Sequence, residues 1–353
     1  RHGTIPDAPA EGVRDGFGLF GDLLGHERRP AALVGGIGIP RHLERFHLDR
    51  RAETMARRAV ALAEAAAKAA VKLGIRLPVV RENLAAAFHG EKTPEAEESV
   101  VRSAYRQWAL TFVEWARTWR RKGLDGAIDR VEIEGDRPLL DALRQGRGVI
   151  AVTAHFGHFE LMPLTWARAH GAINLIVRPL DNRLLNQSLN RLRGRYGCRV
   201  LTRQGIVRNA IRHLRAGEML GVLIDQNMIH REGVFVDFFG KPACTTPLSA
   251  ALALRTGAAV FPGFIIRQAP FRHRLVFGRE IPTIRTGDLQ ADLEANTARH
   301  TQAIEDAIRA HPDHWLWIHR RWRTRPVGGG LLAGASGTGA PGAARADGSG
   351  VSP

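Results

Sequence analysis

The sequence predicts an α/β fold: a twisted, mostly parallel sheet flanked by helices, with a helical segment before it. Three observations support this prediction. Apolar residues recur at helical spacing between residues 51 and 121, and short apolar runs alternate with helical patterns from Val131 onward. Polar residues also recur directly after several of the apolar runs. Strands alternating with helices are typical of parallel sheets that are covered on both faces.

The first predicted helix covers residues 51–73. Apolar residues recur every three or four positions along it, at Met55, Ala59, Leu62, Ala66, Ala69 and Leu73. This is the spacing of one face of a helix. Leu77 and Pro78 break the pattern, so the helix is expected to end before them.

A second helix is predicted for residues from about 95 to 121. Thr93 and Glu97 have the spacing of a capping box, and Pro94 suits the first helical position. One face carries aromatic residues, at Trp108, Phe112, Trp115 and Trp119. Two interpretations remain open: a stripe that faces the core, or an acyl-chain wall or interfacial belt at lipid headgroups.

The pattern of apolar residues predicts the strands and helices of the α/β part. The predicted strands are residues 148–153, 173–178, 199–202, 220–225, 259–266 and 273–278. The predicted helices are residues 138–145, 160–169, 182–196, 206–215, 247–255 and 289–310.

Composition changes at both ends of the chain. Residues 1–50 are rich in Gly, Pro and charge with little periodicity, so poor order is expected there. Residues 327–353 are mainly Gly, Ala and Ser, which predicts a disordered tail. Residues 51–326 are expected to form the functional domain, helical over 51–130 and α/β over 131–326.

The charge balance narrows the class of partner. The chain of 353 residues has 51 Lys and Arg against 35 Asp and Glu, a net charge of +16. Such an excess favours anionic partners: nucleic acid, anionic lipid or an acidic protein. Two cysteines, Cys198 and Cys244, are too few for a disulfide framework or a four-cysteine zinc site. No stretch is long and apolar enough to predict a transmembrane helix, so any membrane contact is expected to be peripheral.

The stretch 151–162 carries the clearest indication of chemistry. His155 follows a predicted strand, Glu160 comes five residues later, and Pro163 requires a helix to start near Glu160. An imidazole can take a proton from a hydroxyl, and a carboxylate on its other ring nitrogen would fix the tautomer. Gly157 and the helix-start amides are candidates for an oxyanion site. The alternative interpretation is a structural histidine and a helix-capping glutamate.

The same stretch contains no Ser or Cys, which favours direct attack by a substrate hydroxyl over a covalent intermediate. Arg178 and Asp225, like His155, stand at or just past the carboxyl end of a predicted strand. Ligands of open α/β sheets bind beyond these strand ends, so the coincidence favours a functional site.

The motif H-F-G-H-F-E at residues 155–160 resembles the H-x-x-x-x-D/E motif of glycerolipid-type acyltransferases. More closely, it resembles the lipid A biosynthesis lauroyl/myristoyl acyltransferases, whose usual form is H-F-G-N-W-E. Further segments agree in order: R-E-N-L at 81–84, G-R-G-V at 146–149, V-R-P at 177–179, D-Q-N at 225–227, V-D-F-F-G-K-P-A-C-T-T at 236–246 and W-L-W-I-H-R-R-W at 315–322. The resemblance covers roughly residues 50–326.

The resemblance implies an enzyme that moves a fatty acyl chain from acyl carrier protein to a hydroxyl of a lipid A precursor. It implies the cytoplasmic face of the bacterial inner membrane and no metal or organic cofactor. His155 would be the base and Glu160 its partner. The chain departs from the family pattern at His158, where Asn is usual, and at Phe159, where Trp is usual. His158 competes as the base, although the spacing to Glu160 favours His155.

Other residues are candidates for substrate binding, each with a structural alternative. Arg178 would hold a phosphate or polarise the thioester carbonyl, or else form an ion pair. Asp225 and Gln226 would orient the acceptor or brace a turn. Lys241 belongs to a segment that would line the acyl pocket or fill a tight turn. The last pair, Arg320 and Arg321, would bind headgroup phosphate or form a solvated basic face.

Rival hypotheses differ in acceptor or in class. The nearest is an acyltransferase for another glycolipid or phospholipid, such as a glycosylated phosphoinositide. A nucleic-acid-binding module is suggested by the charge and by the Trp and Arg residues of 314–323, but the chain has no recognisable reader motif and nucleic acid is not expected. A third hypothesis is a membrane-surface scaffold without catalysis.

Overall fold

The computed structural model describes residues 50–118, 121–201 and 205–326. The expectations for residues 1–49, for Trp119 and for the tail 327–353 lie outside this part of the chain. Within the described residues, no helix combines the length and apolar character needed to cross a bilayer.

A seven-stranded sheet, counted over the described residues, confirms the predicted α/β class. Its order is β1-β9-β8-β2-β5-β3-β4, and every neighbouring pair is parallel except β8 and β9. The strands are β1 (Val131–Glu134), β2 (Val149–Thr153), β3 (Ile173–Ile176), β4 (Cys198–Leu201), β5 (Met219–Leu223), β8 (Ala259–Ala269) and β9 (Arg272–Phe277).

Strand β2 is central and buried over its whole length. Its alternate side chains enter two separate cores, as the pleat of a strand requires. Ile150 and Val152 join one core with residues of α9 (Ile206–Arg215), α10 (Leu248–Thr256) and α11 (Leu289–Ala310). Val149 and Ala151 join the other with residues of α5 (Arg121–Ile128), α6 (Arg137–Arg144) and α7 (Leu161–His170). A strand with apolar neighbours on both faces explains the unbroken apolar run in the sequence.

The helices around the sheet follow the predicted pattern closely. They are α6 (Arg137–Arg144), α7 (Leu161–His170), α8 (Arg183–Arg195), α9 (Ile206–Arg215), α10 (Leu248–Thr256) and α11 (Leu289–Ala310). In α11, Asp288 caps the start by accepting bonds from the backbone amides of Gln290 and Ala291.

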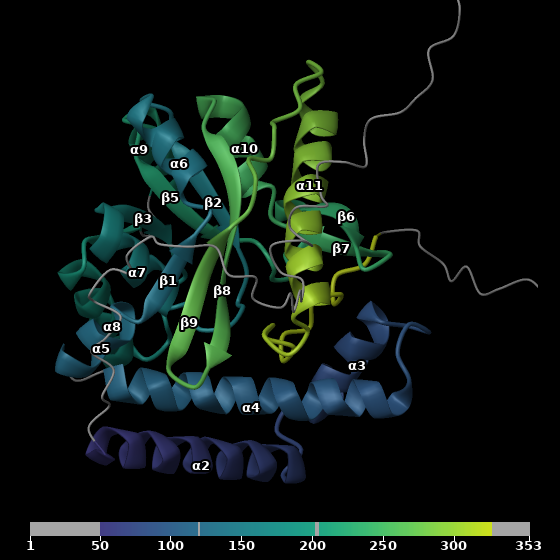
Figure 1. Ribbon diagram of the computed structural model, residues 1–353. Coiled ribbons are helices and arrows are strands. Elements are labelled where there is room, and N and C mark those ends of the chain that lie inside the picture. Colours follow the sequence, from purple (N-terminus) through teal and green to yellow (C-terminus); the bar gives the residue numbers. More distant parts are fainter. Residues whose placement is uncertain (1–49, 119–120, 202–204, 327–353) are drawn as a thin grey trace, which may run out of the picture.

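The helical segment before the sheet comprises α2 (Arg50–Lys72), α3 (Leu77–Ala87), α4 (Pro94–Thr118) and α5 (Arg121–Ile128). Helix α4 lies across one end of the sheet, and α2 lies on its outer side (Figure 1). The first helix ends at Lys72, before Leu77 and Pro78 as expected, and these two residues begin α3. Proline is accommodated there because its missing N–H would have no intrahelical partner in the first turn.

The aromatic side chains on this face of α4 differ in burial. Trp108 packs against the core, and its indole N–H donates to the carbonyl of Trp315 at 3.3 Å. Phe112, one turn later, is exposed. The core-facing interpretation therefore holds for Trp108 and not for Phe112.

A small hairpin lies beside the sheet, formed by β6 (Val234–Phe238) and β7 (Lys241–Thr245). Its two turn residues, Phe239 and Gly240, both have positive φ, which is the backbone of a type I′ turn. The structure thus supports the tight-turn interpretation of this segment, and Lys241 stands opposite Phe238 as the first residue of β7.

Candidate active site

His155 lies just beyond the carboxyl end of β2, in the connection to α7. Helix α7 begins at Leu161, Glu160 occupies its N-cap, and Pro163 lies in the first turn. The predicted order of strand, histidine and acid at a helix start is therefore confirmed.

The residue that holds the His155 ring is Asp225. Strand β5 pairs in parallel with β2, so the residues that follow both strands meet at one edge of the sheet. His155 Nδ1 lies 2.9 Å from Asp225 Oδ1, and the backbone N–H of His155 donates to Oδ2 at 2.9 Å. The indole Nε1–H of Trp315 also donates to Oδ2, at 2.8 Å. Ring and carboxylate are thereby fixed relative to each other.

Electrostatics favour a charged Asp225 and a basic His155. Burial raises the pKa of the Asp225 carboxyl, but His155 and the hydrogen bonds from His155 and Trp315 outweigh it and bring the pKa to about 2. Burial lowers the pKa of His155, but the charge and hydrogen bond of Asp225, with a smaller contribution from the Glu160 charge, raise it above its ordinary value. The carboxylate selects the tautomer with hydrogen on Nδ1, which leaves the lone pair on Nε2.

The Nε2 side of His155 is the accessible side. The side chain is 22% exposed, and the Gln226 amide nitrogen lies 3.2 Å from Nε2. Gln226 itself is exposed. An incoming hydroxyl can therefore reach Nε2 by displacing a surface amide.

Glu160 does not make the predicted hydrogen bond to His155. Its two oxygens accept from Arg193 of α8, at 2.6 Å from Nη2 and 3.3 Å from Nε. Its position at the start of α7 turns the carboxylate towards α8, while the neighbouring strand supplies Asp225. Glu160 acts on His155 only as a nearby charge.

Gly157 is not free to serve as an oxyanion donor, contrary to expectation. Its N–H donates to the carbonyl of His314 at 2.8 Å. The residue has a φ of +56°, and a Cβ would lie 2.1 Å from the carbonyl oxygen of Ile265. Glycine is required because the backbones of β8 and the His155 loop approach so closely.

The burial of His158 argues against this residue as the base. Its side chain is enclosed, its pKa falls to about 3 because of burial, and it packs edge-on against His273 with ring centres 5.7 Å apart. Among the described residues, neither of its ring nitrogens has a hydrogen-bond partner. Only His155 of the two motif histidines combines a carboxylate partner with access to solvent.

Arg321 is buried, so its position does not fit the expected contact with a headgroup. Its guanidinium instead forms hydrogen bonds with residues next to the site. It donates to the carbonyl of Cys244 at 2.9 Å, to Thr245 Oγ1 at 2.5 Å and to the carbonyl of Gln226 at 3.5 Å. Burial lowers its pKa to about 10. These bonds favour the bracing interpretation for the Asp225–Gln226 turn.

The other predicted binding residues occupy three further segments of the chain. Arg178 is exposed beyond the end of β3, Arg320 is exposed after the last helix, and Lys241 lies in the hairpin. Their roles in substrate binding stay predictions. The structure brings together His155, Asp225 and Gln226, with Glu160 at the edge.

The sequence analysis missed the role of the C-terminal strap, defined here as residues 314–324. Leu316 N–H donates to the carbonyl of His155 at 3.0 Å, and the Asn227 N–H donates to His319 Nε2 at 2.9 Å. Asn83 of α3 holds the strap by donating to the carbonyls of Trp317 and His319, each at 2.6 Å. The buried Trp315, Trp317 and Arg321 are unavailable for stacking on bases.

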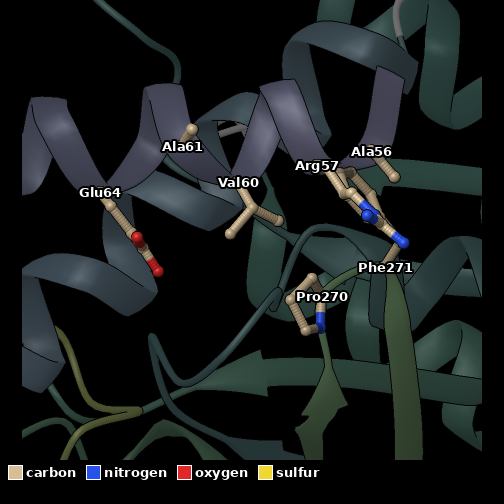
Figure 2. Close-up of a pocket in the computed structure, with 7 residues that line it drawn as sticks. All are labelled: Ala56, Arg57, Val60, Ala61, Glu64, Pro270 and Phe271. Carbon is tan, nitrogen blue, oxygen red and sulfur yellow. The ribbon is translucent and has the colours of Figure 1, made fainter. Parts of the chain in front are cut away.

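A separate pocket of about 390 Å³ lies between α2 and the β8–β9 turn (Figure 2). It is lined by Ala56, Arg57, Val60, Ala61, Glu64, Pro270 and Phe271, none of which belongs to the His155 cluster. In the described part of the chain, no group of three or more His, Cys, Asp or Glu side chains is arranged to hold a metal ion.

A family model and several known proteins match this chain over most of its length. The family model described as bacterial lipid A biosynthesis acyltransferase matches residues 55–324. The lipid A biosynthesis palmitoleoyltransferase of Escherichia coli K12 is 29% identical over 259 residues, covering 72% of this chain and 80% of that protein. The lauroyltransferase of the same strain is also 29% identical, over 72% of this chain and 81% of its own length.

Another group of relatives, which is less similar to this chain, is named for a different acceptor. The phosphatidylinositol mannoside acyltransferase of Mycobacterium tuberculosis (strain CDC 1551 / Oshkosh) is 28% identical over 211 residues, covering 58% of this chain and 64% of that protein. The family model spans most of the sequence, including both His155 and the C-terminal strap. The chain therefore belongs to the bacterial lipid A biosynthesis acyltransferase family, and it is an acyltransferase.

Proposed function

We propose that this enzyme transfers a fatty acyl chain from acyl carrier protein to a hydroxyl of a lipid A precursor, at the cytoplasmic face of the inner membrane. The observation that carries the proposal is the His155–Asp225 pair, whose Nε2 side faces the accessible edge of the sheet. Family membership supports the acyl transfer and a lipid A or related glycolipid acceptor.

In the proposed mechanism His155 is the general base. The acceptor hydroxyl gives its proton to Nε2 while its oxygen attacks the thioester carbonyl carbon. The tetrahedral intermediate then collapses, the C–S bond breaks, and the imidazolium returns the proton to the departing sulfur. Asp225 stays ionised and stabilises the imidazolium through the bond to Nδ1.

A covalent acyl-enzyme on cysteine does not fit the structure. Cys198 and Cys244 are both buried, and burial raises the pKa of Cys198 to about 12 and also raises that of Cys244. Neither thiol is positioned or ionised as a nucleophile. Direct attack by the acceptor hydroxyl is the simpler route, because a thioester is already activated.

The charge of the protein supports the proposed substrates. The carrier protein is acidic and the acceptor carries phosphates, while this chain has a net charge of +16. Such a field raises the encounter rate with anionic partners. The mycobacterial relatives favour one alternative, a glycosylated phosphoinositide as the acceptor, with the base and the fold unchanged.

The test is acyl transfer with the purified chain, acyl carrier protein loaded with a fatty acid, and a lipid A precursor, followed by mass spectrometry of the lipid. We expect a product heavier by one acyl group, and a rate at least about a hundredfold lower for His155→Ala, the scale of general-base loss. Parallel reactions with acyl-coenzyme A and with phosphatidylinositol mannoside separate donor and acceptor alternatives. A fully active, folded His155→Ala enzyme would remove His155 from the mechanism.

A further inference from the structure

Helix α2 has an outward apolar stripe in addition to the face that it packs on the rest of the protein. Ala67 joins the core shared with α4. Leu62 and Leu73 are instead 64% and 75% exposed, and Ile75 in the following turn is 54% exposed. With 3.6 residues per turn, Leu62, Ala66, Ala69 and Leu73 lie within about 60° of one another around the helix axis.

The charges along this helix are almost all positive. Between Thr54 and Arg76 the cations are Arg57, Arg58, Lys68, Lys72 and Arg76, against a single acid, Glu64. Glu64 is turned towards α4, where it accepts a bond from Arg106 Nε at 3.1 Å. In the part of the chain that the structure describes, Arg58, Lys68 and Lys72 form no ion pair, and Arg58 and Lys72 lie on one side of the apolar stripe.

We propose that this α2 face, defined as Leu62, Ala66, Ala69 and Leu73 together with the cations Arg58, Lys68 and Lys72 on one side of them, docks the enzyme on an anionic phospholipid bilayer. Helix α2 then lies in the plane of the interface, with its leucines at the acyl boundary and its cations among the phosphates. The inference rests on the proposed function for the membrane location and for the lipid nature of the acceptor.

The chemistry of the face selects a bilayer over other occupants. A second copy of this chain would bring the same cations opposite these ones, so a symmetric dimer through α2 would be repelled. An acidic protein would match the cations alone. An anionic lipid surface matches both features, because it offers phosphate groups outside and apolar chains directly beneath.

The position of α2 makes the docking useful for catalysis. Helices α2 and α4 cover one end of the sheet (Figure 1). The carboxyl end of α2 leads into α3, whose Asn83 donates to the carbonyls of Trp317 and His319 in the C-terminal strap, and His319 accepts a bond from the backbone N–H of Asn227. A bilayer beneath α2 would therefore lie on the side of the molecule towards which β2 and β8 run, separated from the end of the sheet by α2 and α4.

The stripe is distinct from the pocket on the inner side of α2. Figure 2 shows Val60 and Glu64 on the side of the helix that faces the chain around Pro270. Leu62 and Leu73 do not line that pocket. The stripe is thus a separate convex ridge on the helix, which suits a planar surface better than it suits a small ligand.

The first experiment is co-sedimentation of the full chain with vesicles of phosphatidylcholine alone or mixed with phosphatidylglycerol. We expect strong binding to the mixed vesicles, and an affinity at least about tenfold lower for the double variant Leu62→Glu/Leu73→Glu. Leu289→Glu is the matched control, because Leu289 on α11 is 65% exposed and lies outside the α2 face. Lys68→Glu/Lys72→Glu tests the charge without touching the stripe and should also weaken binding to the mixed vesicles.

The second experiment does not depend on disruptive substitutions. Leu62→Cys is labelled with an environment-sensitive dye, which is selective because the native Cys198 and Cys244 are buried. We expect a blue shift and quenching by brominated lipid on addition of mixed vesicles. Leu289→Cys, labelled in the same way, should show neither.

Several outcomes would overturn the inference. They are unchanged vesicle binding in the leucine variant, a vesicle-insensitive dye at position 62, a change from dimer to monomer alone, or a loss confined to carrier-protein binding. Failure of acyl transfer in the wild type would instead contradict the proposed function, since vesicle binding is measured without turnover. With detergent-dispersed acceptor, the leucine variant should keep the wild-type rate.

Discussion

Two histidine–carboxylate pairs in this protein have the same separation and opposite properties. His155 Nδ1 lies 2.9 Å from Asp225, and His273 Nε2 lies 2.9 Å from Glu114. The pKa of His155 is raised above its ordinary value, whereas that of His273 is lowered. Distance alone therefore does not make a histidine basic.

The difference between the two pKa shifts comes from the further partners of the carboxylates. Burial is the largest cause of the lowered pKa of His273; the hydrogen bond and charge of Glu114 raise this pKa, and the cation of Arg267, which also donates to Glu114, opposes that rise. The other hydrogen bonds to Asp225 come from neutral donors, the indole of Trp315 and the backbone N–H of His155. Burial lowers the pKa of both imidazoles, but only His273 has a neighbouring arginine that adds to the effect.

The comparison separates the proposed catalytic pair from a structural one. His155 is partly exposed at the carboxyl end of the sheet, while His273 and Arg267 are enclosed and tie β8 and β9 to Glu114 of α4. Arg267 also donates to Gln107 and Thr111 of α4, at 2.7 and 2.8 Å. The first arrangement can accept a proton from substrate, and the second stabilises the docking of α4.

The largest expected effect is that of Asp225→Asn. Two donors hold the Oδ2 position, so the amide NH₂ would occupy the Oδ1 position and face Nδ1, selecting the wrong tautomer of His155. Turnover should fall by about a thousand- to ten-thousandfold, as in other base–carboxylate pairs. Steady-state kinetics measures this, and Asp129→Asn, in an exposed ion pair, is the control. Near-normal turnover in the folded variant would show that Asp225 does not orient the base.

Arg267→Met should destabilise the fold without disabling the site. The substitution removes the positive charge that is paired with the buried Glu114 carboxylate, so the free energy of unfolding should fall by about 3–5 kcal/mol. Arg272→Met is the control on the same hairpin, since its pair with Glu132 is exposed and should contribute less than about 1 kcal/mol. Urea denaturation measures both. Equal losses in the two variants would contradict the structural role of the buried pair.

His158→Asn should reduce turnover only mildly, well below the hundredfold expected for a general base. The imidazole is enclosed and keeps a low pKa, and Asn is the residue that the family pattern usually has there. Initial rates of acyl transfer, with thermal melting as a folding check, test this expectation. Abolished activity in a folded protein would transfer the base assignment to His158.

The smallest effect concerns pH. A base works when neutral, so kcat/KM should rise with pH through a midpoint above 6.5, because the pKa of His155 is raised. The charge of Glu160 contributes to that rise, so Glu160→Gln should move the midpoint to lower pH. Glu280→Gln, in an exposed pair with Arg147, should leave the profile in place. An unmoved midpoint in Glu160→Gln would show that this charge does not reach His155.

Local patterns predicted the fold and the base, but not the partner of the base. Strand β2 and helix α7 were visible because apolar runs and helix-start residues are local signals. His155 was found for the same reason. Asp225 lies 70 residues away and Trp315 a further 90, so their hydrogen bonds depend on strand order, which no local pattern encodes.

Glu160 was assigned as the partner of His155 because it matches the acid of the H-x-x-x-x-D/E motif, whereas in the structure its carboxylate at the helix start turns towards Arg193. Arg321 was expected at the surface because arginine is ordinarily exposed. Its burial depends on the carbonyls of Cys244 and Gln226, which the hairpin and the Asp225 turn bring together. Such contacts exist only after the chain has folded.

The C-terminal strap gives this enzyme an order of assembly. During synthesis both His155 and Asp225 emerge long before Trp315, which supplies the indole donor that fixes them. A nascent or truncated chain that stops before position 315 would contain His155 and Asp225, but it would lack the Trp315 indole that holds them in place. The alignment of His155 and Asp225 therefore depends on a side chain that lies 90 residues beyond Asp225 in the sequence.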